Sequence, residues 1–163
     1  MGIQWNKVRF FSKTGDQWPE SPDRYADPKL IYTLDKYRDL LGHPVYVSPV
    51  YGALARFNDS PNVSKTSRHY VGNRNHPERL SDAIDIFPSS SEKKSWLTAL
   101  SMPEWGAIGI YFDTYFQGQR RFMLHLDLRP IHKARVLWFR IDKKYYYPLK
   151  DSSVLDRLFN FLK

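Results

Sequence analysis

Three short segments of this 163-residue chain carry side chains that could bind a catalytic metal ion. In chain order they are Ser67–Gly72 with His69, Asp82–Ile86 with Asp85, and Phe122–Arg129 with His125 and Asp127. Two histidines and a carboxylate form a ligand set of catalytic zinc sites, in which three protein ligands leave one position open for water. If the segments converge in the folded chain, they predict a metal-dependent hydrolase.

The setting of Asp85 is unusual for a charged residue. It lies between Ile84 and Ile86 in a segment whose composition indicates a buried strand. Burying a carboxylate costs free energy unless the group is paired or binds a metal. A salt bridge to an arginine is the alternative to a metal ligand, and the sequence leaves both interpretations open.

His125 and Asp127 fall on one face of a predicted strand, because side chains repeat every two residues. The leucines that alternate with them point to the other face. An exposed polar face with an ordinary histidine–aspartate contact would give the same pattern. His69 ends a polar loop, and a single histidine in such a place is more often a surface or hydrogen-bonded residue than a ligand. The metal interpretation therefore depends on all the segments together.

The composition indicates a globular protein. Hydrophobic residues make up 42% of the chain and aromatic residues 16%, which is enough for a core in a single domain. There is no cysteine, so disulfides, thiolate catalysis and cysteine zinc sites are excluded. Any metal must therefore be held by histidine, aspartate or glutamate.

The formal net charge of +8 favours an anionic partner such as nucleic acid, anionic lipid or an anionic cell-wall polymer. No run of basic residues stands out beyond isolated pairs, and no nucleic-acid-binding motif is present, so nucleic acid is the partner we expect least. The segment Met1–Phe11 lacks the apolar core of a signal peptide, and no stretch is long enough to span a bilayer. We expect a protein made in the cytoplasm, whose delivery to any outside substrate depends on something else.

The elements that must position these side chains are of mixed type. Asp27 and Gly42 predict the two ends of a first helix, and Ser89 with Glu92 predicts the start of a second. The segments 44–48, 83–87, 106–111, 122–128, 136–141 and 145–147 predict strands, and 52–68 predicts a long loop. This order predicts an α+β fold, an antiparallel sheet covered on one face by helices. We expect a single domain over 1–163, with an irregular arm at 1–27, a catalytic core at 28–150 and a helix within 151–163.

The motifs resemble those of the zinc D-Ala-D-Ala carboxypeptidases and phage L-alanyl-D-glutamate endopeptidases, whose fold is shared with the Hedgehog signalling domain. The family signature has the form S-x-H-x-x-G-x-A-x-D and is followed later by a third ligand, a histidine. Ser67, His69 and Gly72 match its first half, and Ala83 and Asp85 match its second half.

Two further segments extend this resemblance. Leu124–Arg129 is similar to an F-x-H-x-D-x-R strand that ends the site in one branch of the family, and Gly106–Tyr111 is similar to the glycine-containing strand before it. The resemblance covers residues 28 to 140 and implies a Hedgehog-like peptidase fold. It also implies His69, Asp85 and His125 as ligands of Zn²⁺, and bacterial peptidoglycan as the substrate. A nearby base would take a proton from the attacking water.

The chain departs from the signature by an insert, Asn73–Ser81, which places His69 and Asp85 16 positions apart. The site requires this insert to loop out, and its polar composition permits that. The insert also contains His76, a competing ligand. We prefer His69 because Ser67 and Gly72 flank it as in the signature.

The catalytic base is the least defined part of the site. Relatives place an acid or a histidine just before the third ligand, where this chain has Phe122 and Met123. Asp127 is the remaining carboxylate on the face of His125, so we expect it to act as the base or to orient a ligand. Glu78 and Asp113 are weaker candidates.

Substrate contacts are expected from Arg56 and Ser67. Many relatives grip a substrate carboxylate with an arginine just after the early strand, but Val47–Tyr51 contains none. Arg56 is the nearest arginine and could make a bidentate contact. The alternative for Arg56 is an ordinary surface arginine.

The sequence thus predicts a zinc metallopeptidase that cuts stem or cross-link peptides of peptidoglycan. Without a signal peptide, it would be a phage or prophage lysin that starts in the host cytoplasm or the virion. The alternative is an inactive virion or tail module that retains the fold, suggested by the missing acid and the insert. The sequence predicts neither the bond that is cut nor the oligomeric state, and the same ligands would accept other divalent ions.

Overall fold

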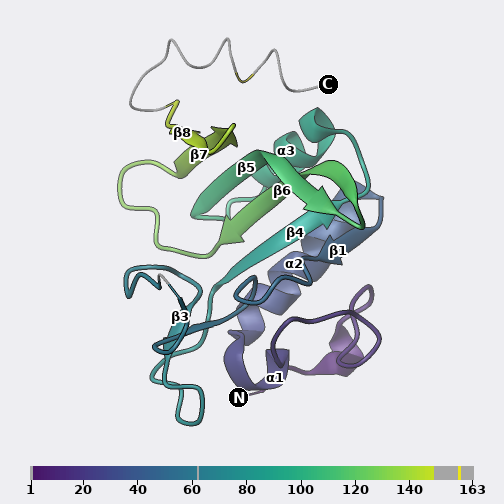
Figure 1. Cartoon of the computed structure of the whole chain (residues 1–163). Coiled ribbons are helices and arrows are strands. Elements are labelled where there is room, and N and C mark those ends of the chain that lie inside the picture. The colour runs from purple at the N-terminus through teal and green to yellow at the C-terminus, as the bar shows by residue number, and fades with distance from the viewer. Residues whose placement is uncertain (1, 62, 149–157, 159–163) are drawn as a thin grey trace.

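A six-stranded β-sheet forms the centre of the computed structural model, which describes residues 2–61, 63–148 and 158 (Figure 1). Across the sheet the strands are β1 (Val45–Val47), β4 (Ala83–Pro88), β6 (Gln119–Asp127), β5 (Ala107–Phe116), β7 (Val136–Ile141) and β8 (Lys144–Tyr146). A separate parallel pair, β2 (Arg56–Phe57) and β3 (Tyr70–Gly72), lies beside it. The sheet and its helices make an α+β fold, as the sequence predicts.

Helix α2 (Pro28–Leu41) has the predicted ends. Asp27 caps it by accepting the N–H of Lys29, and Pro28 occupies the first turn, where its missing N–H is no loss. Gly42 ends it in the left-handed conformation, with φ of 70°. The local signals at both ends therefore suffice to define this helix.

Helix α3 (Glu92–Ser101) starts two residues later than the sequence suggested. Its cap is Ser91 in place of Ser89, because the hydroxyl of Ser91 accepts the N–H of Lys94. Adjacent serines made the choice ambiguous. The arm at 1–27 also has more structure than expected, since it contains η1 (Trp5–Lys7) and α1 (Pro22–Tyr25).

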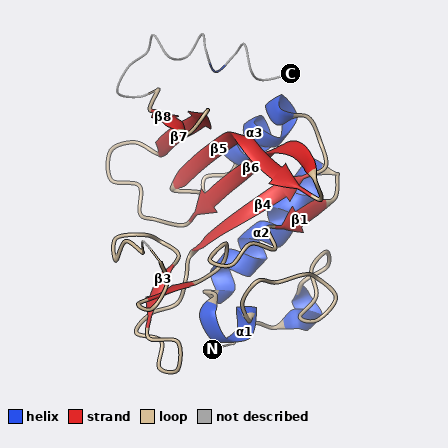
Figure 2. Cartoon of the chain, viewed as in Figure 1, coloured by secondary structure: helices blue, strands red, loops and turns tan. Residues whose placement is uncertain are grey.

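The two longer helices, α2 and α3, cover the same face of the sheet (Figure 2). The core between them is built from branched and aromatic side chains of the helices and of alternate strand positions. It includes Leu30, Ile31, Leu34 and Tyr37 of α2, Trp96 of α3, and Ile84, Ile86, Ile108, Ile110, Leu124 and Leu126 of the sheet. Each fully buried side chain of this kind contributes about 2 kcal/mol from the hydrophobic effect, which holds the helices on this face.

The opposite face carries the candidate site, and the strand register decides which residues share it. Asp85 pairs directly with His125, His125 with Gly109, and Gly109 with Trp138. Directly paired residues point to the same side of a sheet. This row therefore crosses four strands on the face that the helices leave free.

One strand pairing differs from the expected antiparallel sheet, because β5 and β7 run parallel. Strand β6 ends at Asp127 opposite Ala107, the first residue of β5. The short connection 128–135 passes that end and begins β7 at Val136, again opposite Ala107. Since β5 and β7 both start at the same end of the sheet, they run in the same direction.

The C-terminal helix expected within 151–163 lies outside the described residues, apart from Leu158, which is buried in the main core. Among the helices that the structure describes, none has the length and apolar character needed to cross a membrane.

We predict that Gly109→Ala destabilises the protein by about 1–3 kcal/mol, the usual effect of forcing extra volume into a packed site. A Cβ atom at Gly109 would lie 2.3 Å from Cε2 of Trp138. Urea denaturation measures the free energy of unfolding, and Gly2→Ala is the control because a Cβ at Gly2 meets nothing within 4 Å. Equal stability of the two variants would show that Trp138 does not occupy this position.

Candidate metal centre

The side chains of His69, Asp85 and His125 converge, so that these residues could hold a metal ion. Nε2 of His69 lies 3.0 Å from Nδ1 of His125, and Nδ1 of His125 lies 2.9 Å from Oδ1 of Asp85. The third side of the triangle, between Nε2 of His69 and Oδ1 of Asp85, measures 3.5 Å. Ligands bound tetrahedrally to zinc at about 2.0–2.1 Å stand about 3.3 Å apart, so the triangle has the size of a zinc site.

Two of these side chains are placed by the sheet and the third by a loop. Asp85 on β4 and His125 on β6 are direct cross-strand partners. His69 directly precedes β3, and its carbonyl accepts the N–H of Arg56, 2.7 Å away. Its own N–H donates to the hydroxyl of Ser67 at 3.3 Å. The pairing of β2 with β3 thus brings the loop histidine to the sheet.

The insert 73–81 loops out, as the site requires. Gly72 forms an antiparallel bridge with Pro77, and the N–H of Glu78 donates to the carbonyl of Val71 at 2.9 Å. His76 is exposed in this loop and belongs to no metal-ligand cluster among the described residues. His69, and not His76, is therefore the histidine of this loop region that lies in the cluster.

Asp127 lies on the far side of the His125 ring from the cluster. Its Oδ2 is 3.1 Å from Nε2 of His125, whereas Nδ1 of that ring faces Asp85. Asp127 is fully buried, and Arg129 donates to it through Nε at 2.8 Å and through its backbone N–H at 3.1 Å. A carboxylate in this position fixes the tautomer and the orientation of a metal-binding histidine.

Trp138 supports His125 from the side, although it belongs to none of the sequence motifs. The centres of the two rings are 5.1 Å apart, and the indole N–H of Trp138 donates to the hydroxyl of Tyr111 at 3.2 Å. Gly109 leaves the space that the indole fills. A glycine inside a strand of bulky residues signals such a close approach and could have indicated this contact.

The charges in the cluster are set by burial and by the neighbouring groups. Burial lowers the pKa of His69, so its ring is neutral and offers a lone pair. Burial also acts to raise the pKa of Asp85 and to lower that of His125. For Asp85, its contacts with His69 and His125 outweigh burial and lower its pKa. For His125, its contacts with Asp127 and Asp85 outweigh burial and raise its pKa to about 9. Without a metal, His125 is the cation of the cluster.

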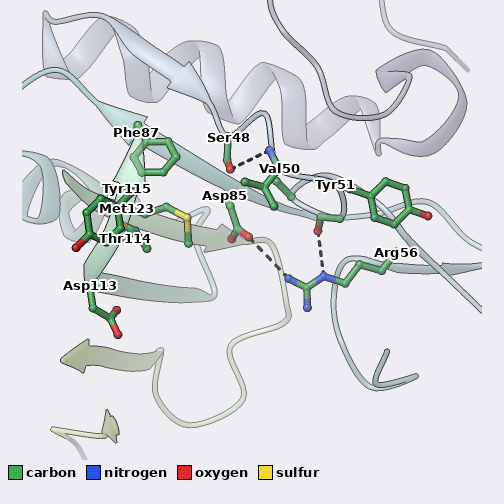
Figure 3. A pocket seen from close by; sticks show the side chains of 12 residues that line it. Ser48, Val50, Tyr51, Arg56, Asp85, Phe87, Asp113, Thr114, Tyr115 and Met123 are labelled. Carbon is green, nitrogen blue, oxygen red and sulfur yellow. Dashed lines mark hydrogen bonds and ion pairs between the residues drawn. The ribbon is translucent and has the colours of Figure 1, made fainter. Parts of the chain in front are cut away.

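An open cleft of about 270 Å³ lies next to Asp85 (Figure 3). Arg56 points into it, with Nη2 3.8 Å from Oδ2 of Asp85 and Nε donating to the carbonyl of Gly52 at 3.0 Å. Apolar side chains, among them Phe87 and Met123, line much of the remainder. The cluster therefore adjoins a space that a substrate could occupy.

The other residues singled out in the sequence lie in different places. Ser67 does not line the cleft, and its hydroxyl instead accepts the N–H of His69. Glu78 is exposed in the insert. Asp113 lines the cleft, but its carboxylate accepts hydrogen bonds from Nε of Arg140 at 2.8 Å and from the N–H of Lys143 at 2.7 Å. Of the expected substrate contacts, Arg56 is the one that the structure brings to the cleft.

Comparisons of the chain with models of known protein families, with curated proteins and with solved structures gave no match. The chemistry assigned to the site accordingly rests on the residues and their geometry.

We predict that metal binding releases about one proton near pH 7, because a raised pKa keeps His125 protonated without metal and a metal-bound imidazole is neutral. Metal affinity should then rise about tenfold per pH unit up to about pH 9, where His125 loses its proton unaided. Calorimetric titration with Zn²⁺ in buffers of different ionisation enthalpy measures the released protons. A pH-independent affinity between pH 7 and pH 8 would contradict this charge assignment.

Proposed function

We propose that the protein is a zinc-dependent metallopeptidase that hydrolyses stem or cross-link peptide bonds of bacterial peptidoglycan. The observation that carries the proposal is the convergence of three buried side chains, His69, Asp85 and His125, beside an open cleft. Two nitrogen ligands and one carboxylate suit a catalytic zinc site, which keeps one position free. Other divalent ions could occupy the same ligands, so zinc is part of the proposal.

A zinc ion in this place would lower the pKa of bound water and polarise the carbonyl of the bond to be cut. The residues of the chain supply the positioning. Asp85 presents Oδ1 to both histidines and leaves Oδ2 facing Arg56. Arg56 lines the cleft with its Nε held by the carbonyl of Gly52, and its guanidinium could bind a substrate carboxylate there.

We assign Asp127 the role of orienting His125. A base must reach the water that attacks the substrate, whereas Asp127 is fully buried and bonds to the nitrogen of His125 that points away from the cluster. Its other contacts come from Arg129, and it is not among the residues that line the cleft. The sequence allowed Asp127 to be either the base or an orienting group, and this geometry favours the second.

The proposed substrate is supported by the resemblance of the two signature halves to those of peptidoglycan peptidases. The net charge of +8 suits an anionic cell wall. The fold proposed for it is the Hedgehog-like peptidase fold. We propose a phage or prophage lysin that acts on the wall from the host cytoplasm or from the virion.

The second candidate is a virion or tail module that keeps the fold and the metal but has no activity. It is favoured because the carboxylates that line the cleft, among the described residues, are all engaged in other contacts. These are Asp85, which belongs to the metal ligands, and Asp113, which Arg140 and Lys143 engage. Neither is free to act as a general base, so a proton acceptor for hydrolysis must come from elsewhere.

We predict that the purified protein releases soluble fragments from peptidoglycan, and that a chelator abolishes this release until Zn²⁺ is restored. His69→Ala should lose both bound metal and activity, since it removes one of three ligands. His76→Ala is the matched control, because His76 is exposed and outside the cluster. Elemental analysis and a turbidity assay on walls of several chemotypes measure both quantities. Bound zinc without hydrolysis of any wall would favour the structural module.

Asp127→Asn distinguishes the two roles of Asp127. If it orients His125, the variant should bind Zn²⁺ about 10–100-fold more weakly, the usual effect of losing such a partner, and should regain activity in excess zinc. If it is the base, the variant should keep wild-type metal affinity and stay inactive at saturating zinc. We expect the first result, measured by zinc titration together with the rate of peptidoglycan hydrolysis.

A further inference from the structure

Glu20 is a buried carboxylate in the N-terminal arm that the chemistry above does not use. It is 7% exposed, and its two oxygens accept three backbone N–H groups. Oε1 accepts from Gly52 at 2.6 Å, and Oε2 accepts from Leu54 at 3.1 Å and from Ala55 at 2.9 Å. These hydrogen bonds offset part of the cost of burial, and they tie the segment 52–55 to the N-terminal arm.

The first of two consecutive peptide groups in this segment connects Glu20 to Asp85. The peptide between Ala53 and Leu54 donates its N–H to Glu20. Its carbonyl, on Ala53, accepts the backbone N–H of Asp85 at 3.0 Å. One rigid peptide plane therefore separates the Glu20 carboxylate from the backbone of a metal ligand.

The next peptide group connects Glu20 to His69 in the same way. The peptide between Leu54 and Ala55 donates its N–H to Glu20, and its carbonyl lies 3.4 Å from Nδ1 of His69. A carbonyl can only accept, so this contact favours the tautomer with the proton on Nδ1. The lone pair of Nε2 is then directed toward Asp85 and His125, as metal binding requires.

We propose that Glu20 is a positioning residue of the metal centre, which holds the backbone of Asp85 and the ring of His69 through these two peptide groups. The inference rests on the metal centre of the proposed function. It makes the N-terminal arm part of that centre, although the arm contributes no ligand.

Asp35 on α2 provides a matched control. It is 6% exposed and also accepts two backbone N–H groups of the arm, from Arg9 at 3.0 Å and from Phe10 at 2.8 Å. Asp35→Asn therefore weakens a buried carboxylate-to-backbone contact of the same kind, but at residues 9 and 10 instead of the segment 52–55. A loss of stability alone would affect both variants.

The experiment measures metal binding by the full chain carrying Glu20→Gln, Glu20→Ala or Asp35→Asn. Zn²⁺ affinity is determined by competition with a chromogenic chelator, and Co²⁺ reports the ligand geometry through its visible absorption. Circular dichroism and thermal unfolding confirm that each variant is folded.

We expect Glu20→Gln to weaken Zn²⁺ binding about 10–100-fold and to reduce the tetrahedral Co²⁺ absorption, as loss of an outer partner of a ligand does. Asp35→Asn should lower the melting temperature but leave the affinity within about twofold, because its backbone partners, Arg9 and Phe10, differ from those of Glu20. If Glu20→Ala does not fold, Glu20→Gln alone decides, since it retains the volume of the side chain.

Wild-type affinity and spectrum in folded Glu20→Gln would overturn the proposal, and so would equal weakening by Asp35→Asn. If the unmodified protein bound neither Zn²⁺ nor Co²⁺, this inference and the proposed function would fail together. If it bound metal, with Glu20→Gln weakening that binding, but released nothing from peptidoglycan, only the proposed activity would fail.

Discussion

Burial of the Asp85 carboxylate is the constraint on which the rest of the site depends. A charge that is 8% exposed in a strand of isoleucines would be unfavourable without partners. Two imidazoles meet one of its oxygens, and Arg56 faces the other. Since each partner comes from a different part of the chain, the contacts that pair this carboxylate are the same ones that assemble the candidate metal centre.

The sheet permits this burial because one of its faces packs in the core and the other carries the cluster. Alternate residues of β4 and β6 enter the core under α2 and α3, and the residues between them carry the site. The core face contributes the hydrophobic free energy that keeps the strands in register. A shift of one residue would exchange the faces and bury leucine where His125 stands, so core packing and site geometry are coupled.

The polar neighbours of the cluster form an outer layer that comes from distant parts of the sequence. Asp127 reaches His125 along their shared strand and is itself held by Arg129, and Trp138 reaches His125 across Gly109. Glu20 acts on Asp85 and His69 through the backbone of 52–55. Each candidate ligand is thus held by other groups of the protein, which would reduce the reorganisation needed to bind a metal.

Much of the fold and of the cluster could be predicted because the signals are local. The caps at Asp27 and Gly42 define α2, a short apolar run marks β4, and leucines alternating with His125 and Asp127 mark β6. The absence of cysteine restricts the metal ligands to three residue types. The choice between Ser89 and Ser91 as the cap of α3, and the parallel pairing of β7, were beyond local signals. The cap of α3 depends on which serine hydroxyl reaches a free N–H group. The direction of β7 depends on the end of the sheet from which the connection 128–135 enters it.

The sequence by itself determined which residues could serve as ligands and that two of them share a strand face, because residue type and the two-residue period need no tertiary contact. Only the tertiary structure decided that His69, and not His76, meets Asp85. The insert folds back so that Pro77 pairs with Gly72, which leaves His76 in an exposed loop. The tertiary structure also decided that Asp127 stands behind His125, and that Glu20 and Trp138 support the cluster. Those facts depend on strand register and loop packing, which bring together residues that no spacing along the chain relates.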